Sequence, residues 1–304
     1  MALSSISGLL KTAAARRLPL WEVILQDDLA ERGGDRGASL RRMAALWEAM
    51  KRASREYRAE ARSSSGLVGG DGAKMAAYAA RGGIGGAFPC RIVAEALRMG
   101  ENNACMGRIV AAPTAGSCGV LPAVLLPLAE RDKIPDDEIV HALYVAAGFG
   151  EVIAARASIS GAEGGCQAEI GSASAMAAAA LVSLKKGTPE MSAHACAMAL
   201  MNLLGLVCDP VAGLVEVPCV NRNAVGALNA VGCADMALAG IRSRIPPDEV
   251  IDAMRSVGDM MPAALRETGR GGLAATPSGL AAARKLREEA DSPTPSAQNG
   301  ADSV

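Results

Sequence analysis

The stretch QAEIGSASAMAAAALVSLKKGTPEMSAHACAMALMNLLGLV, residues 167–207, decides the fold class. It is rich in Ala, Met and Leu, and it lacks the alternation of β-branched residues that is typical of strands. In its middle, residues 185–187 (KKG) favour a helix end, and residues 188–189 (TP) favour a new helix start. We therefore predict two apolar helices, over 167–186 and 190–207.

The same helical pattern continues on both sides of this stretch. The chain has 304 residues, of which 50% are hydrophobic and 21% charged, enough to bury a large core. We predict an all-α fold, a multi-helix domain with loops rich in Gly and Pro. The expected organisation is one helical catalytic domain over 1–289 and a disordered tail over 290–304, where the sequence is polar and small. Further helices are predicted over 38–62, 73–80, 223–242 and 248–260.

Charge and hydropathy exclude several classes of partner. The net charge is −1 and no polybasic run is present, so we expect neither nucleic acid nor a membrane as a partner. The longest uncharged run, 109–129, could span a bilayer by length, but it holds three prolines. We interpret it as a buried loop and a broken helix. The first 25 residues lack the apolar region and cleavage site of a secretory signal, so we expect a cytoplasmic protein.

Eight cysteines and two histidines limit the kinds of metal site that this chain can build. Cys208 and Cys219 bracket a turn-rich segment, and Cys166 follows three glycines at a point where a helix is expected to begin. Three loop cysteines without histidine partners suit iron–sulfur chemistry, with structural or redox thiols as the alternatives, because gaps of 42 and 11 residues match no compact ligand motif. Cys196 and Cys233 fall in apolar helical patterns and are expected to be buried and inert. The remaining cysteines stay ambiguous: Cys90, Cys105 and Cys118.

Several long and unusual strings resemble one known family. The sequence is similar to the alpha chain of the bacterial, two-chain type of iron–sulfur-dependent L-serine dehydratase. This resemblance covers nearly the whole chain apart from the tail. The strings that carry it are PLWEVIL (19–25), SSSGLVGGD (63–71), ENNACMGRIVAAPTAGSCGVLPA (101–123), SGAEGGCQAEIGSAS (160–174), CDPVAGLVEVPCVNRNA (208–224) and ALRETGRGGLAATPSG (264–279).

The resemblance implies a cofactor and a reaction. It implies an all-helical alpha domain with a [4Fe–4S] cluster held by Cys166, Cys208 and Cys219. The fourth iron is left open for the hydroxyl of L-serine, which then loses water by β-elimination. The products would be pyruvate and ammonia, as in amino-acid degradation and gluconeogenesis.

Substrate-binding candidates lie in three loops, and each has a structural alternative. The hydroxyls and amides of the first loop suit the substrate carboxylate, or the loop is a flexible linker. The second loop is a candidate anion site or a set of turns. The third candidate, Asn102, is a donor to the substrate or a helix cap. The candidates are Ser63, Ser65 and Gly66 in the first loop, Thr114 and Ser117 in the second, and Asn102.

The sequence departs from the related single-chain enzymes in two ways, one that points to a partner chain and one that points to sensitivity to oxygen. The Ser-His-Thr motif of those enzymes is missing, so we expect the general base from a separate beta chain, within an oligomer. The last cysteine is Cys233, so no C-terminal cysteine can cap the fourth iron, and we expect rapid damage by oxygen. Three rival interpretations stay open: a PLP-dependent lyase using Lys74, a cysteine desulfidase of related fold, and a non-enzymatic iron–sulfur sensor.

Overall fold

The alanine-rich stretch forms two adjacent helices at the centre of the molecule, as predicted. α9 (Ser172–Leu184) is buried at nearly every position, and α10 (Pro189–Met201) packs against it. The side chain of Thr188 caps α10 by accepting a hydrogen bond from the Met191 N–H. Because most of the side chains are Ala, the two helix axes can approach closely.

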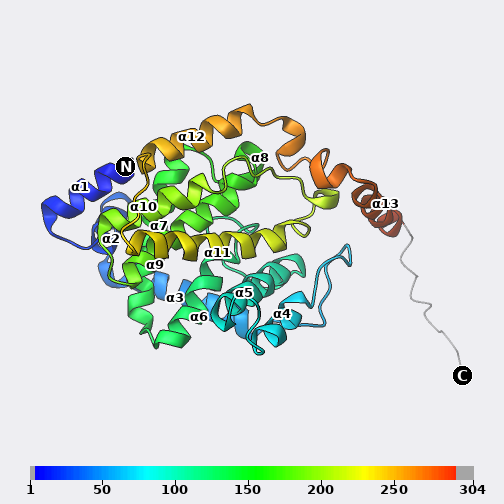
Figure 1. Cartoon of the computed structure of the whole chain (residues 1–304), viewed down its shortest axis with the longest axis horizontal. Helices are drawn as coiled ribbons and strands as arrows, with labels where there is room; N and C mark the ends of the chain where they lie inside the picture. The colour runs from blue at the N-terminus through cyan, green and yellow to red at the C-terminus, as the bar shows by residue number, and fades with distance from the viewer. Residues whose placement is uncertain (1–3, 292–304) are drawn as a thin grey trace, which may run out of the picture.

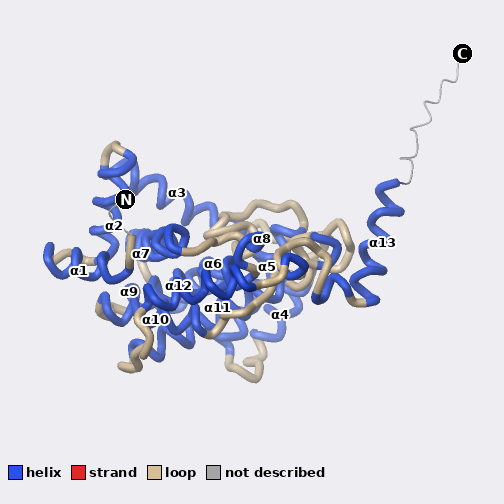
Figure 2. Tube along the Cα trace, turned by 90° about the horizontal axis from the view of Figure 1, so that it is seen from above, coloured by secondary structure: helices blue, strands red, loops and turns tan. Residues whose placement is uncertain are grey.

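The structure, a computed structural model, describes residues 4–291 and consists of thirteen α-helices joined by loops (Figures 1 and 2). Within this range no strand is present, which confirms the all-α prediction. One isolated β-bridge pairs Cys208 with Arg266. The other helices are α1 (Ile6–Arg16), α2 (Leu20–Arg32), α3 (Arg36–Arg55), α4 (Asp71–Ala79), α5 (Ala87–Ala104), α6 (Val120–Asp132), α7 (Asp136–Arg156), α8 (Gly161–Gly164), α11 (Cys219–Leu238), α12 (Pro247–Met260) and α13 (Pro277–Asp291).

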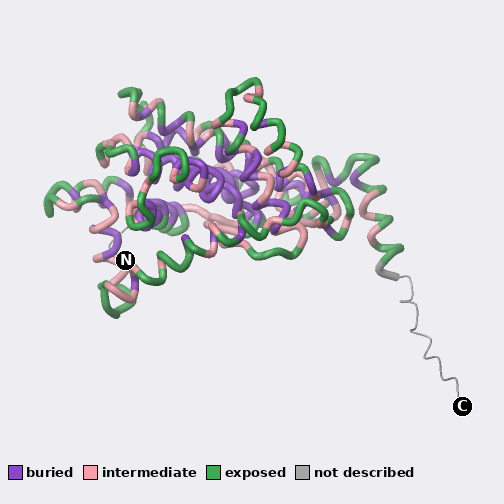
Figure 3. The backbone as a smooth tube through the Cα atoms, turned by 90° about the horizontal axis from the view of Figure 1, so that it is seen from below, coloured by how far each residue is buried: buried purple, intermediate pink, exposed green. Residues whose placement is uncertain are grey.

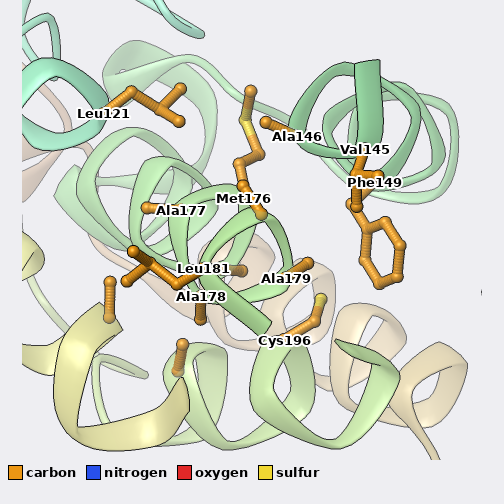
Figure 4. Close-up of a cluster of buried hydrophobic side chains, with 14 of the residues drawn as sticks. Leu121, Val145, Ala146, Phe149, Met176, Ala177, Ala178, Ala179, Leu181 and Cys196 are labelled. Atoms are coloured by element: carbon orange, nitrogen blue, oxygen red, sulfur yellow. The ribbon is translucent and has the colours of Figure 1, made fainter. Parts of the chain in front are cut away.

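The core lies around α9, which contacts α6, α7, α10 and α11. Burial is concentrated in these central helices, and the outer helices and loops are exposed (Figure 3). Figure 4 shows Met176 and its α9 neighbours lying between α7, which supplies Phe149, and α10, which supplies Cys196. A fully buried side chain of the size of Phe149 contributes roughly 1.5–3 kcal/mol of transfer free energy.

Two predicted helices are shorter in the structure. α3 ends at Arg55 rather than at residue 62, because the chain turns there and the Tyr57 hydroxyl donates to the Glu101 carboxylate. α10 ends at Met201 rather than at residue 207; turns follow, and Gly205, with a φ of +83°, excludes a helix that continues through it.

Two other helix boundaries concern cysteines. Cys219 is the first residue of α11, which runs to Leu238, so this helix begins and ends four residues earlier than the predicted 223–242. Cys166 directly precedes a π-helical turn, η1 (Gln167–Gly171), which then continues into α9. π-helical turns are rare and are frequently found at functional sites.

The apolar run 109–129 and the C-terminal tail can also be compared with their predictions. The run 109–129 is loop as far as Gly119, only partly buried over 109–115, and its remainder belongs to α6. This helix continues through Pro122 and Pro127 to Asp132, so the prediction of a buried loop and a broken helix was wrong. By length and composition α7 passes the test for a membrane span, but 67% of its apolar window is buried inside the protein, as in a core helix. α13 extends to Asp291, two residues into the predicted tail, and the rest of the tail lies outside the described residues.

Candidate functional site

Three cysteines from distant segments meet at the end of the molecule near α13. Cys166 follows α8, Cys208 lies in the loop after α10, and Cys219 opens α11; that loop continues into η2 (Val211–Gly213), which contacts α13 (Figure 1). Their exposed fractions are 2%, 2% and 5%. The thiols are therefore presented by three different backbone segments around one buried point.

Their pKa values show that the three thiols are electrostatic neighbours. Burial raises the pKa of Cys166 and of Cys219 to about 12, and Cys166 also raises that of Cys219. The pKa of Cys208 is raised by burial first, then by Cys166 and Cys219 among its neighbours. A metal reverses this balance, because a coordinating thiol is deprotonated outright.

Backbone hydrogen bonds to the segment around Arg266 hold Cys208 in place. Its N–H donates to the Leu265 carbonyl at 2.8 Å, and its carbonyl accepts from the Glu267 N–H at 2.8 Å. Glu267 has a φ of +62°, an uncommon conformation for a residue with a side chain. The string ETGRGG (267–272) lies against the cysteine loop, since a Cβ at Gly269 would lie 3.2 Å from Gly213 N and one at Gly272 would overlap Asp209 Oδ2.

Arg222 connects two of the cysteine segments from the first turns of α11. It donates to the Val207 carbonyl at 2.7 Å and to Asp209 Oδ1 at 2.9 Å, and it also hydrogen-bonds the Cys166 thiol. The other carboxylate oxygen of Asp209 accepts from the Leu273 N–H at 2.8 Å. The guanidinium is therefore a fixed positive charge beside the thiols.

Two carboxylates and one thiol converge on Gly161. A Cβ at this position would lie 2.8 Å from Glu169 Oε2, 3.0 Å from Cys208 Sγ and 3.1 Å from Glu267 Oε2. Glycine is therefore required for these groups to approach. Burial raises the pKa of Glu169, and the nearby charge of Glu267 raises it further.

The second predicted substrate loop holds the carboxylate of Glu169. Thr114 Oγ1 donates to Glu169 Oε1 at 2.7 Å, and the Thr114 and Ser117 hydroxyls lie 3.0 Å apart. Gly116 also borders this carboxylate, since a Cβ there would lie 2.9 Å from Glu169 Oε1. The donors therefore suit a carboxylate, and here the protein's own carboxylate engages them.

The first predicted substrate loop shows the same arrangement with another acid. The hydroxyls of Ser63 and Ser65 both donate to Glu216 Oε2, from Ser63 at 2.6 Å. The Gly66 N–H donates to the Ser63 carbonyl, which closes a tight turn. A role in binding a substrate carboxylate stays a prediction, and it requires this side chain to move.

Asn102 lies in the last turn of α5 and is buried. Its side-chain amide donates to the Ala53 carbonyl at 2.8 Å, and its main-chain carbonyl accepts from the Gly107 N–H. These contacts connect α5 to α3 and to the loop that follows α5, so they account for Asn102 as a structural residue.

Comparisons with known proteins place this arrangement in a family. The sequence model of the family described as Serine dehydratase alpha chain matches residues 15–274, a span that holds all three cysteines. This chain belongs to the serine dehydratase alpha-chain family. The match ends just before α13.

Several curated relatives are named as L-serine dehydratases or as their alpha chains. The alpha chain is 57% identical over 225 residues to "Probable L-serine dehydratase, alpha chain" of Bacillus subtilis, covering 74% of this chain and 75% of that protein. It is 51% identical over 208 residues to "L-serine dehydratase, alpha chain" of Peptoniphilus asaccharolyticus, covering 68% and 71%. "L-serine dehydratase 1" of Escherichia coli is 46% identical over 181 residues, which cover 59% of this chain and 40% of that protein.

The remaining cysteines of the alpha chain lie elsewhere. Cys196 and Cys233 are buried in helices, as predicted, and the Cys118 thiol lies 3.6 Å from the Met99 carbonyl. Cys90 is buried and Cys105 is partly buried. None of these five affects the pKa of the three site thiols.

The alpha-chain site depends on four charged residues that were not among the residues predicted for it. Glu169 and Arg222 each lie three residues after a cysteine and so follow it by about one helical turn; a charge in an otherwise apolar helix was the available signal. Glu216 and Glu267 lie in irregular loops, where no periodic pattern marks a buried acid.

Proposed function

We propose that this chain is the catalytic alpha chain of an L-serine dehydratase that eliminates water from L-serine and releases pyruvate and ammonia. The relatives named above support serine dehydration. The observation that carries the proposal is the meeting of three buried thiols, Cys166, Cys208 and Cys219, with a fixed guanidinium and two carboxylates beside them.

The donor set of the three thiols fits an iron–sulfur cluster better than a single ion. Within residues 4–291, three or more ligand atoms lie within 4.8 Å of one another only at Asp27, Glu31 and Glu151, an acidic group. The thiols are therefore spread too widely for one small ion, and soft sulfur ligands without imidazole favour an iron–sulfur group. When bound, a [4Fe–4S] cluster would supply Lewis-acid activation of the substrate hydroxyl.

The residues around the thiols would position substrate and balance charge. Arg222 stabilises anionic sulfur at Cys166 and keeps Asp209 in place. The Thr114 loop and the Ser63 loop both hold carboxylates, so either suits the carboxylate of an amino acid after a side-chain exchange. Burial of the thiols excludes water from this point.

Neither histidine supplies a base at this point. His141 stacks on Trp21 with ring centroids 3.7 Å apart, on the α2 side of α7. His194 lies in α10, with Arg242 and Glu190 as its charged neighbours. We therefore propose that a beta chain completes the site and contributes the general base, within a cytoplasmic oligomer.

Turnover of the anaerobic complex tests this function. The full chain should be purified without oxygen together with its cognate small chain, and pyruvate and ammonia measured with L-serine and with L-cysteine. We expect equal amounts of both products from L-serine and faster turnover than with L-cysteine. Faster turnover of L-cysteine would indicate a desulfidase, and an iron-loaded complex without turnover would indicate a sensor.

A further inference from the structure

A separate groove lies between α3, α4, α5 and α6, and none of the site residues described above lines it. Its volume is about 730 Å³, ample for a small metabolite. Alanines form much of its wall, among them Ala76 in α4, Ala80 directly after α4 and Ala94 in α5, so the space is not filled by large side chains.

A buried acid faces this groove without a complete set of partners. Glu95, in the middle of α5, is 7% exposed, and its Oε1 has no hydrogen-bond partner within the described part of the chain. Two groove residues contact this carboxylate: Ser54 hydrogen-bonds it, and Arg98 Nη1 lies 3.6 Å from the other oxygen, Oε2. A buried carboxylate oxygen without a donor is destabilising unless a ligand supplies one.

A buried donor lies one helical turn away on the same face of α5. Arg98 Nε is buried and also has no partner in the described residues. The guanidinium is held 5.4 Å over the Tyr57 ring, and its stem packs against the backbone of Gly72. The orientation of the unused N–H is therefore set by packing.

The charges at the rim of the groove balance one another. Lys51 pairs with Asp136 at 2.7 Å, and Arg91 pairs with Glu130. Arg55 pairs with Glu48 at 2.5 Å. A rim that is already neutralised gives no attraction to a phosphate or a nucleotide, and it favours a ligand without net charge.

We propose that this groove binds a free amino acid as a zwitterion, with its ammonium on Glu95 Oε1 and its carboxylate on Arg98 Nε. A ligand with a cationic donor and an anionic acceptor a few ångströms apart satisfies both unused groups, and a ligand with only one charge does not. The inference does not depend on the proposed function, because it uses none of the thiols.

Binding of charge-matched probes to the full chain tests this site. L-alanine carries both charges, propionate only the carboxylate and ethylamine only the ammonium. We expect saturable calorimetric binding of L-alanine, and of L-serine, with at least tenfold weaker binding of propionate and ethylamine. Equal binding of a one-charge probe, or no saturable binding of L-alanine at millimolar concentration, would overturn the proposal.

Variants in the groove localise the binding. Glu95→Gln should raise the dissociation constant for L-alanine at least tenfold, whereas Glu130→Gln, an equal charge change at the rim, should leave it within twofold. Because Glu95→Gln removes a buried charge, we expect it to fold. Ala80→Leu fills the groove from an exposed position and should weaken binding without touching either charge. Unchanged affinity in both Glu95→Gln and Ala80→Leu would show that L-alanine binds elsewhere.

Discussion

Replacement of Arg222 by Met tests whether one buried ion pair holds the cysteine segments together. The side chains of Arg222 and Asp209 are 14% and 5% exposed, and their charged atoms lie 2.9 Å apart. Without the guanidinium, Asp209 would keep a buried charge and only the backbone contact from Leu273. Breaking a buried pair in this way costs about 3–5 kcal/mol.

The effect should be large enough to separate it from an ordinary surface change. In a chain of this size each 1 kcal/mol shifts the melting temperature by about 2–4 °C, so we expect Arg222→Met to melt about 10 °C lower. The matched control is Arg156→Met, because Arg156 pairs with Asp252 at side-chain exposures of 27% and 54%. Loss of such an exposed pair should cost less than about 1 kcal/mol.

Urea denaturation of cluster-free protein measures these differences without any contribution from bound iron. A double-mutant cycle with Asp209→Asn should give a coupling energy of about 1–3 kcal/mol, since the neutral amide no longer needs the guanidinium. The reasoning is refuted if Arg222→Met costs no more than Arg156→Met, or if the Arg222→Met and Asp209→Asn effects are additive.

Three further perturbations test other parts of the structure. Gly161→Ala should reduce pyruvate formation about tenfold, which corresponds to about 1.4 kcal/mol in the activation free energy, because the added methyl group would lie 2.8 Å from the Glu169 carboxylate. The control is Gly232→Ala in α11, where an added methyl group would have no neighbouring atom within 4 Å, and turnover should be unchanged. Burial raises the pKa of Glu95 above its ordinary value of 4.5, so as the pH falls the folded state binds a proton here before the unfolded state does. Glu95→Gln should therefore unfold at a higher temperature than the parent near neutral pH, with the difference vanishing below pH 4.5; a difference that grows in acid contradicts this assignment. Ser63→Ala removes a donor from the buried carboxylate of Glu216 and should lower the free energy of unfolding by about 1–3 kcal/mol, and an unchanged urea midpoint would show that this contact is not needed.

Much of the fold follows from local patterns that can be read in the sequence. The alanine-rich positions of α9 and the Thr188–Pro189 start of α10 specify their helices locally, because propensity and capping act within a few residues. The end of α3 at Arg55 was predicted less accurately, since the tertiary contact of Tyr57 with Glu101 lies just beyond it. The end of α10 at Met201 was also missed, although Gly205 was a visible signal against a helix up to residue 207.

The candidate site was predictable only in part. The loop positions of the three cysteines marked them as different from the helical Cys196, and the structure brings them together. Pairing across the chain, such as Thr114 with Glu169 over 55 residues, leaves no periodic signal in the sequence. For the same reason, no local pattern indicated that the two candidate anion loops would hold the protein's own carboxylates.

The central claim, that three thiols bind one iron–sulfur cluster, is tested most directly by metal analysis of two cysteine variants purified without oxygen. The parent and Cys196→Ala, which removes a buried thiol of the core, should each hold about four iron and four sulfide per chain. Cys208→Ala should lose most of both while keeping its helical circular dichroism spectrum. Iron and sulfide contents in Cys208→Ala equal to those of Cys196→Ala would contradict the account.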